Sequence, residues 1–183
     1  MLKERELEII RQVQEGNTSV YSELVDHYKD AAFTLSVRIC GNRDDAADIC
    51  QEAFIKAFRA LNNFRAQSGF STWLYRIVYN TAISHLRSIK IKTSPLDGLH
   101  EIASDDETGM DDSMRKLVRK LVAGLPEVDR TIVTLYYLMD HSISEIAEII
   151  SISESNIKVR LHRSRMKLHE ELSLQLDLQT IQY

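Results

Sequence analysis

Glycine and proline are scarce in this chain of 183 residues, which has six glycines and two prolines. Because turn-rich β-folds use both residues heavily, this scarcity disfavours an all-β protein. Alanine, leucine, isoleucine, glutamate, arginine and lysine dominate instead, and these residues suit helices. Hydrophobic residues make up 44% of the chain, which is enough for a real core. The composition predicts an all-α protein, with room for two compact units.

Cysteines and long apolar runs are also rare. The two cysteines, Cys40 and Cys50, have no set of His or Cys partners, so neither a metal site nor a disulfide framework is expected. We expect two free, partly buried thiols in a reducing cytosol. No apolar run approaches the roughly 18 residues that span a bilayer. The charged amino terminus, MLKERELEII, lacks the apolar segment of a signal peptide. These absences predict a cytoplasmic protein that does not insert into a membrane.

Sequence motifs of catalysis are missing as well. The chain has no Gly-rich phosphate loop, no cluster of metal ligands and no nucleophile motif. Its six histidines are scattered and have no evident partners. We therefore expect no enzyme activity and no cofactor.

Charge divides the chain into three parts. The formal net charge is −4, and residues 91–113 hold seven acidic residues and one basic residue, whereas residues 1–90 and 114–183 are each net +1. The middle part combines Ser-Pro and Asp-Gly turn chemistry with no helical periodicity. It predicts a flexible acidic linker between two small helical domains. The linker could be a spacer or a mimic of nucleic acid.

The first domain shows the periodicity of helices. We expect helices near residues 3–15 and 18–40, a third helix capped by Asn42 or Asp44, and a fourth that begins with Ser71 or Thr72 as its cap and stays periodic to about Leu86. The predicted core face of the third helix consists of Ala47, Cys50, Phe54, Phe58 and Leu61.

A basic segment near the end of the chain stands out in an acidic protein. Residues 153–168, SESNIKVRLHRSRMKL, hold five Lys or Arg and one acid. Before it, Ser142 and Glu145 have the spacing of a capping box, and Ser153 can cap the basic helix. Between the two helices Ser151 stands where a glycine is common, so the turn could differ slightly. Helix, tight turn and basic amphipathic helix is the helix-turn-helix arrangement of DNA-binding proteins.

The predicted buried face of the basic helix consists of Ile157, Leu161, Ser164 and Leu168. The residues that can reach base edges or phosphates are Ser155, Asn156, Lys158, Val159, Arg160, His162, Arg163 and Arg165. The alternative is an ordinary solvated face. An upstream helix begins near Pro126, and four of its residues can pack on the motif: Ile132, Leu135, Tyr136 and Met139.

Two more surfaces are candidates for binding. Arg76, Tyr79 and Asn80 share a helix face that can stack on and hydrogen-bond to unpaired bases, and the preceding loop, residues 62–69, could hold a base. Phe70 and Trp73 in the same stretch are expected in the core. The third helix also carries an acidic stripe that could dock a protein or could be ordinary solvated charge. The stripe consists of Asp45, Asp48 and Glu52, with Ile55, and with Gln51 at the edge.

The chain resembles the extracytoplasmic-function class of bacterial sigma factors over residues 8–172. The resemblance is carried, in this order, by the segments DDAADICQEAFIKAF, FSTWLYRIVYNTAISHLR, LPEVDRTIVTLYYL and ISEIAEIISISESNIKVRLHRSRMKL. The resemblance implies region 2 at residues 1–90 and region 4 at residues 114–183. It implies three partners: RNA polymerase core, promoter DNA and an anti-sigma factor. The main alternative is a stand-alone helix-turn-helix regulator, which would need its own dimer interface.

The resemblance also implies roles for individual residues. Asp48, Gln51 and Glu52 correspond to the segment that docks on the polymerase. The residues that correspond to those contacting the −10 element of the promoter are Phe64, Arg65, Arg76, Tyr79 and Asn80. The residues that correspond to those contacting the −35 element are Ser155, Asn156, Lys158, Arg160, His162, Arg163 and Arg165. The linker would thread the active-site channel of the polymerase.

Overall fold

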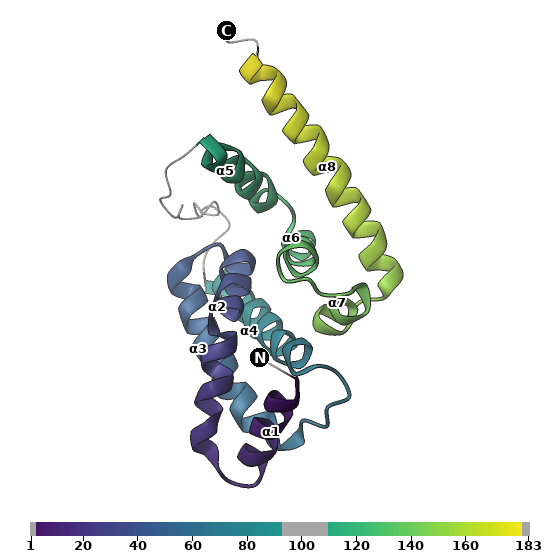
Figure 1. Cartoon of the computed structure of the whole chain (residues 1–183). Coiled ribbons are helices and arrows are strands. Elements are labelled where there is room, and N and C mark those ends of the chain that lie inside the picture. The colour runs from purple at the N-terminus through teal and green to yellow at the C-terminus, as the bar shows by residue number, and fades with distance from the viewer. Residues whose placement is uncertain (1–2, 93–109, 181–183) are drawn as a thin grey trace.

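The computed structural model describes residues 3–92 and 110–180, and every regular element in these ranges is a helix (Figure 1). The N-terminal elements are α1 (Lys3–Gln14), η1 (Thr18–Val20), α2 (Tyr21–Cys40), α3 (Arg43–Ala60), η2 (Leu61–Asn63) and α4 (Phe70–Lys92). The C-terminal elements are α5 (Met110–Ala123), α6 (Glu127–Val133), the π-helical turn η3 (Thr134–Leu138), α7 (Ile143–Ile150) and α8 (Glu154–Thr180). The all-α prediction is confirmed. Most of the expected linker lies outside the described residues.

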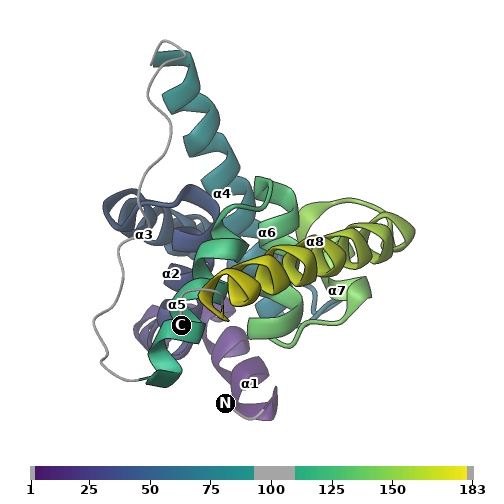
Figure 2. The same ribbon diagram turned by 90° about the horizontal axis from the view of Figure 1, so that it is seen from above.

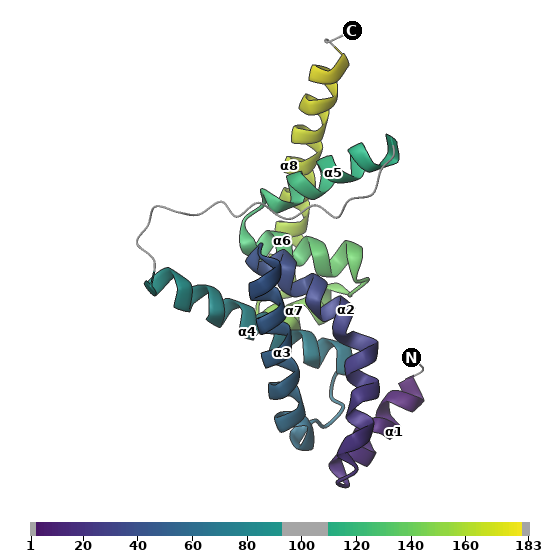
Figure 3. The ribbon, with the colours of Figure 1, turned by 90° about the vertical axis from the view of Figure 1, so that its left-hand side faces the viewer.

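The N-terminal half is a bundle in which α2, α3 and α4 pack on one another and α1 packs on α2 (Figure 3). A left-handed Gly41, with a φ of 77°, ends α2. Asn42 then caps α3, because its side-chain oxygen accepts hydrogen bonds from the amides of Asp44 and Asp45. The predicted cap at Asn42 is confirmed. Helix α4 begins at Phe70, slightly before the expected cap, and runs past Leu86 to Lys92.

The C-terminal half is built around α8, against which α5, α6 and α7 pack. Pro126 precedes the first residue of α6 and has an extended conformation, one position before the expected start. Ile132 and Leu135 are fully buried, as predicted. The prediction for Tyr136 is wrong, since this side chain is 37% exposed. The π-helical turn widens the helix at this point and turns Tyr136 and Tyr137 outward.

The two halves contact each other through α4 with α7 and through α2 with α6. Arg130 of α6 donates a hydrogen bond from Nη2 to the carbonyl oxygen of Ile39 at 3.0 Å. The rings of Tyr75 and His141 meet edge to face with centroids 5.3 Å apart. Burial raises the pKa of Tyr75 to about 12 and lowers the pKa of His141. A single hydrophobic cluster therefore continues from one half into the other.

Two helix ends project from this body. The C-terminal end of α8 points away from the N-terminal helices (Figures 1 and 3). The C-terminal end of α4 extends in another direction (Figures 2 and 3). The first turns of α8, in contrast, lie next to α7, which rests on α4 (Figure 1). The predicted DNA-binding helix and the predicted base-binding helix are thus close together in this structure.

Candidate nucleic-acid and protein interfaces

Helices α7 and α8 form the predicted helix-turn-helix. The capping box is present: the Glu145 amide donates to Ser142 Oγ at 3.3 Å, and the Ser142 amide donates to Glu145 Oε2 at 2.8 Å. Ser151 adopts the left-handed conformation, with φ 58° and ψ 46°. Ser153 Oγ accepts a bond from the Asn156 amide at 3.4 Å, at the start of α8. The turn therefore has the usual geometry, although a serine occupies the position that favours glycine.

The two faces of α8 are as predicted. Ile157, Leu161 and Ser164 are buried, and Leu168 is half-buried. Val159 is 47% exposed on the outer side. The other exposed candidates are Ser155, Asn156, Lys158, His162, Arg163 and Arg165. The outer face of this helix thus combines hydrogen-bonding and cationic side chains that are free to meet a groove of DNA.

Arg160 differs from the other basic residues of α8 because its own domain restrains it. Its Nη1 lies 2.7 Å from Asp129 Oδ1 of α6, and its side chain is 36% exposed. Its Nε also donates to Asn156 Oδ1 at 3.0 Å. To contact a phosphate, the Arg160 guanidinium must either leave the Asp129 carboxylate or bind the carboxylate and the phosphate at the same time.

The candidate −10 face of α4 is open at two of its three positions. Arg76 and Asn80 are exposed, whereas Tyr79 is half-buried. Burial raises the pKa of Tyr79, and the nearby Glu127 raises it further. Because Glu127 belongs to α6, the C-terminal half closes over one side of this face.

Phe64 and Arg65 take different places although they are neighbours in the sequence. The Phe64 side chain is 8% exposed, and its ring lies 5.8 Å from that of Phe70 and 5.1 Å from that of Trp73. Arg65 is exposed at the start of the loop. Phe64 therefore supports the loop from the core, and Arg65 is available for contact. Phe70 is buried as expected, and Trp73 is half-buried against the core.

The acidic stripe of α3 faces outward. Asp48, Gln51 and Glu52 are all exposed. Glu52 forms an ion pair with Lys56 at 2.7 Å, so part of its charge is balanced within the helix. Asp45 is half-buried beside His85, 3.2 Å from its Nε2. The part of the stripe that a partner can reach is therefore Asp48, Gln51 and Glu52.

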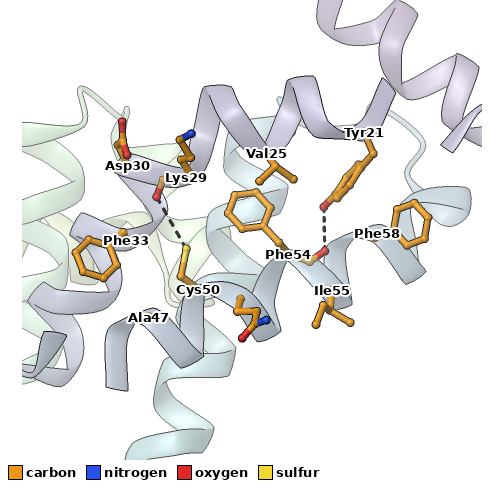
Figure 4. Close-up of a pocket in the computed structure, with 11 residues that line it drawn as sticks. Tyr21, Val25, Lys29, Asp30, Phe33, Ala47, Cys50, Phe54, Ile55 and Phe58 are labelled. Carbon is orange, nitrogen blue, oxygen red and sulfur yellow. Dashed lines mark hydrogen bonds between the residues drawn. The ribbon is translucent and has the colours of Figure 1, made fainter. Parts of the chain in front are cut away.

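An apolar groove runs between α2 and α3, next to this stripe (Figure 4). Its volume is about 690 Å³. Helix α2 contributes Tyr21, Val25, Lys29, Asp30 and Phe33, and helix α3 contributes Ala47, Cys50, Gln51, Phe54, Ile55 and Phe58. The walls are held together by the Tyr21 hydroxyl, which donates to the Phe54 carbonyl at 2.9 Å, and by the rings of Tyr21 and Phe58, 5.0 Å apart. Gln51 belongs to both the stripe and the groove.

The groove corrects one prediction and adds residues that the sequence did not single out. Ala47 and Phe58 were expected in the core but are exposed and line the groove. Val25 and Phe33 of α2 form its other wall, and the guanidinium carbon of Arg43 lies 5.3 Å from the centre of the Phe33 ring. The sequence does contain a sign of the groove: the apolar stripe on α3 is wider than the face that packs on the core, so part of it must remain exposed.

Both cysteines are free thiols; Cys40 is half-buried and Cys50 is buried. In the described ranges no group of three or more His, Cys, Asp or Glu side chains is placed to hold a metal ion. None of the helices in this part of the chain combines the length and the apolar character that crossing a bilayer requires.

Comparisons with known proteins agree with this arrangement. Residues 24–90 match the family model of sigma-70 region 2, and residues 115–168 match that of sigma-70 region 4. The chain is 33% identical to the ECF RNA polymerase sigma factor SigW of Bacillus subtilis (strain 168), over 94% of this chain and 97% of SigW.

Two solved structures show the same fold. One is CnrH in complex with the cytosolic domain of CnrY, with a TM-score of 0.66 and 22% identity over 91% of this chain and 96% of that chain. The other is the sigma factor RpoE in complex with the anti-sigma factor NepR from Bartonella quintana, with a TM-score of 0.66 and 20% identity over 84% of this chain and 96% of that chain. With both regions matched in order and a relative aligned over nearly its whole length, the chain belongs to the extracytoplasmic-function RNA polymerase sigma factors.

Proposed function

We propose that this sigma factor uses three separate surfaces to direct RNA polymerase to its promoters. The α2–α3 groove and its acidic rim bind the polymerase core, the outer face of α4 and the preceding loop act on the −10 element, and α8 reads the −35 element. Sigma factors are initiation factors that work within the polymerase holoenzyme. Membership of this family therefore argues against the alternative of a stand-alone regulator. The observation that most supports the proposal is the exposed polar face of α8 on a fully capped helix-turn-helix.

The chemistry of α8 suits the major groove of DNA. Ser155, Asn156, Lys158 and His162 offer hydrogen bonds to base edges, and Val159 offers an apolar contact to a thymine methyl group. Arg163 and Arg165 reach phosphates, and Arg160 joins them when it leaves Asp129. The base-reading and phosphate-binding roles are thus divided along one helix.

The chemistry of α4 suits unpaired DNA. Asn80 carries a donor and an acceptor for the edge of a base, Arg76 carries a cation for the backbone, and Tyr79 carries a ring on which a base can stack. Arg65 adds a cation at the entrance of the loop. Phe64 serves this surface indirectly, because its ring anchors the loop in the aromatic cluster.

The groove suits a helix of the polymerase. An amphipathic helix buries its apolar ridge in a groove of this kind. Asp48 and Glu52 then lie at the polar rim, where they pair with basic residues of the partner, and Gln51 lies between rim and groove. Such an arrangement divides the work: apolar burial supplies affinity, and the rim charges supply orientation.

The acidity of the whole chain fits action within a holoenzyme. A protein with a net charge of −4 gains little non-specific affinity for DNA, because that affinity comes from the neutralisation of phosphates. The polymerase then supplies most of the affinity, and α8 supplies selectivity. The site of action is the cytoplasm, and the protein contributes no catalytic group of its own.

An anti-sigma factor is the remaining partner that we propose. RpoE of Bartonella quintana, which has a similar fold, was solved in complex with the anti-sigma factor NepR. The open groove and the contact between α4 and α7 offer apolar surfaces that such an inhibitor can cover or hold in place.

Run-off transcription tests the proposed function. Purified protein is added to core polymerase on genomic fragments, and start sites are mapped. We expect transcripts that depend on both proteins and that share −35 and −10 motifs at a fixed spacing. Transcripts that start at unrelated sequences, or none at all, would contradict the proposal, as would specific binding to duplex DNA without polymerase.

A further inference from the structure

The last residue of α1 contacts the base of the candidate −10 loop. Gln14 Nε2 lies 2.9 Å from the carbonyl oxygen of Leu61 and 3.1 Å from that of Phe64. Both carbonyls lie where α3 ends through η2. The Leu61 carbonyl also accepts a hydrogen bond from the Phe64 amide at 3.0 Å, so Gln14 adds a second bond to this turn, and the Phe64 carbonyl lies just beyond it. One side chain therefore links the end of α3 to Phe64 at the base of the loop, across about 50 residues of sequence.

Helix α1 is anchored well enough to act as a support. Ile9 and Val13 are buried against the bundle. Arg5 donates two hydrogen bonds from its Nη2 to the Glu23 carboxylate of α2, at 2.7 and 2.8 Å. The Tyr28 hydroxyl of α2 donates to Glu6. Since α1 lies outside residues 24–90, which match region 2, this support is an addition to the matched segment.

The loop that follows is fixed at its base and free at its tip. Phe64 is held through its ring by the aromatic cluster and through its carbonyl by Gln14. Arg65, Ala66 and Gln67 are exposed, and in the described part of the chain these three residues form no hydrogen bond. Ala66 has a φ of 51°, a conformation that is unfavourable for residues other than glycine. A strained tip with free donors and acceptors is suited to contact a ligand.

We propose that Gln14 is a positioning residue for the −10 element. It holds the Leu61 and Phe64 carbonyls and so sets the direction in which residues 65–67 are presented to an unpaired base. This inference depends on the proposed role of the loop in reading opened DNA. Fixing the base of the loop in advance lowers the entropy that is lost when the loop binds DNA.

The test compares three variants in holoenzyme. Gln14→Leu keeps the size of the side chain and removes both hydrogen bonds. Gln14→Lys restores a donor of similar reach. Gln12→Leu is the matched control, because Gln12 lies on the same helix but bonds with Glu8 and Asn17 and does not contact the loop. The measurements are affinity for core polymerase, the rate of open-complex formation followed by permanganate reactivity of −10 thymines, and base preference in a −10 library.

We expect Gln14→Leu to slow open-complex formation about fivefold or more, the effect of losing two neutral hydrogen bonds, and to change preference at one −10 position. Affinity for core should stay unchanged, and Gln14→Lys and Gln12→Leu should resemble the parent. The change in preference matters most, because a merely destabilised protein would lose activity on all sequences alike.

Two results would overturn the inference: parental behaviour of Gln14→Leu, or an equal loss in Gln14→Leu and Gln12→Leu. A separate variant, Arg65→Ala with Gln67→Ala, distinguishes the two levels of the proposal. If this loop variant opens and reads −10 DNA like the parent, the proposed role of the loop fails. If the loop variant is impaired and Gln14→Leu is not, the loop role stands and the positioning role is rejected.

Discussion

At the scale of single residues, exposure along α8 followed from the sequence, but restraint by neighbouring residues did not. Arg160 and Arg163 both flank the outer face of α8, and periodicity treats them alike. The structure separates them, since Arg160 is held by Asp129 at 2.7 Å and Arg163 is exposed. An ion pair formed by a residue 31 positions away leaves no mark on local periodicity.

The first prediction concerns the division of work on α8. Lys158→Ala should change preference at one or two −35 positions and cost about 1–3 kcal/mol on the preferred base, because it removes a contact to a base edge. Arg163→Ala should weaken binding to all sequences alike. It should also lower the steepness of the plot of log affinity against log salt concentration by roughly one. A −35 library selected with parent and variant holoenzymes at two salt concentrations measures both effects. If neither variant changes affinity or preference, α8 does not lie in the groove.

The second prediction concerns the turn before α8. Ser151 has a φ of 58°, which costs residues other than glycine about 1–2 kcal/mol. Ser151→Gly should therefore raise the free energy of unfolding by up to about 1 kcal/mol, because the greater freedom of glycine in the unfolded chain offsets part of the gain. Denaturant unfolding measures the change, with Ser155→Gly, in the first turn of α8, as a control that should gain no stability. A loss of stability in Ser151→Gly would contradict the observed turn.

At the scale of elements, the groove between α2 and α3 is a product of two helices. Ile55 is 44% exposed and Phe58 is 38% exposed, and neither is needed to close the core. Large apolar side chains that remain exposed next to charged residues commonly mark protein interfaces. The groove therefore predicts that apolar side chains, and not only the acidic stripe, contribute to binding of the polymerase core.

We expect Ile55→Ser to weaken affinity for core polymerase about tenfold, as for an apolar anchor worth just over 1 kcal/mol, with little change in melting temperature. Leu7→Ser is a suitable control, because Leu7 is 50% exposed on α1 and does not line the groove. Competition with a labelled parent protein measures the affinity. Equal effects of the two substitutions would show that the groove is not the docking surface.

The sequence predicted the helices and their caps better than the surfaces between them. Asn42 and the Ser142–Glu145 capping box were recognisable because their partners lie within three residues. Phe58 was assigned to the core, because an apolar stripe does not reveal which of its edges a neighbouring helix covers. The helical part of the fold was thus predictable from local pattern, whereas the groove required the packing of α2 on α3.

At the scale of the whole molecule, the two halves are packed together, although a promoter requires them apart. Helix α7 contacts both α4 and α8, so the axes of α4 and α8 are roughly 20 Å apart near α7, about two interhelical spacings. The −10 and −35 elements are about 25 base pairs apart, on the order of 85 Å along the duplex at 3.4 Å per base pair. Both elements can be bound at once only after α7 leaves α4. The contacts that hold this closed arrangement join residues far apart in the sequence, such as Tyr75 with His141 and Ile39 with Arg130, and local patterns cannot reveal them.

The last prediction opens this arrangement with one substitution. His141 is 8% exposed between the Tyr75 ring and Glu145, whose Oε2 lies 3.7 Å from its Nδ1. In His141→Asp an unpaired carboxylate at this place costs several kcal/mol when buried, and Glu145 repels it, so the halves should separate. Small-angle X-ray scattering should show a larger radius of gyration for His141→Asp than for the parent, and no change for His169→Asp, which alters an exposed histidine of α8. If the closed form competes with assembly, the opened variant should bind core polymerase at least as tightly as the parent, since a larger fraction is ready to bind. A parent that is already as extended as His141→Asp would show that contact between α4 and α7 does not restrain the free protein.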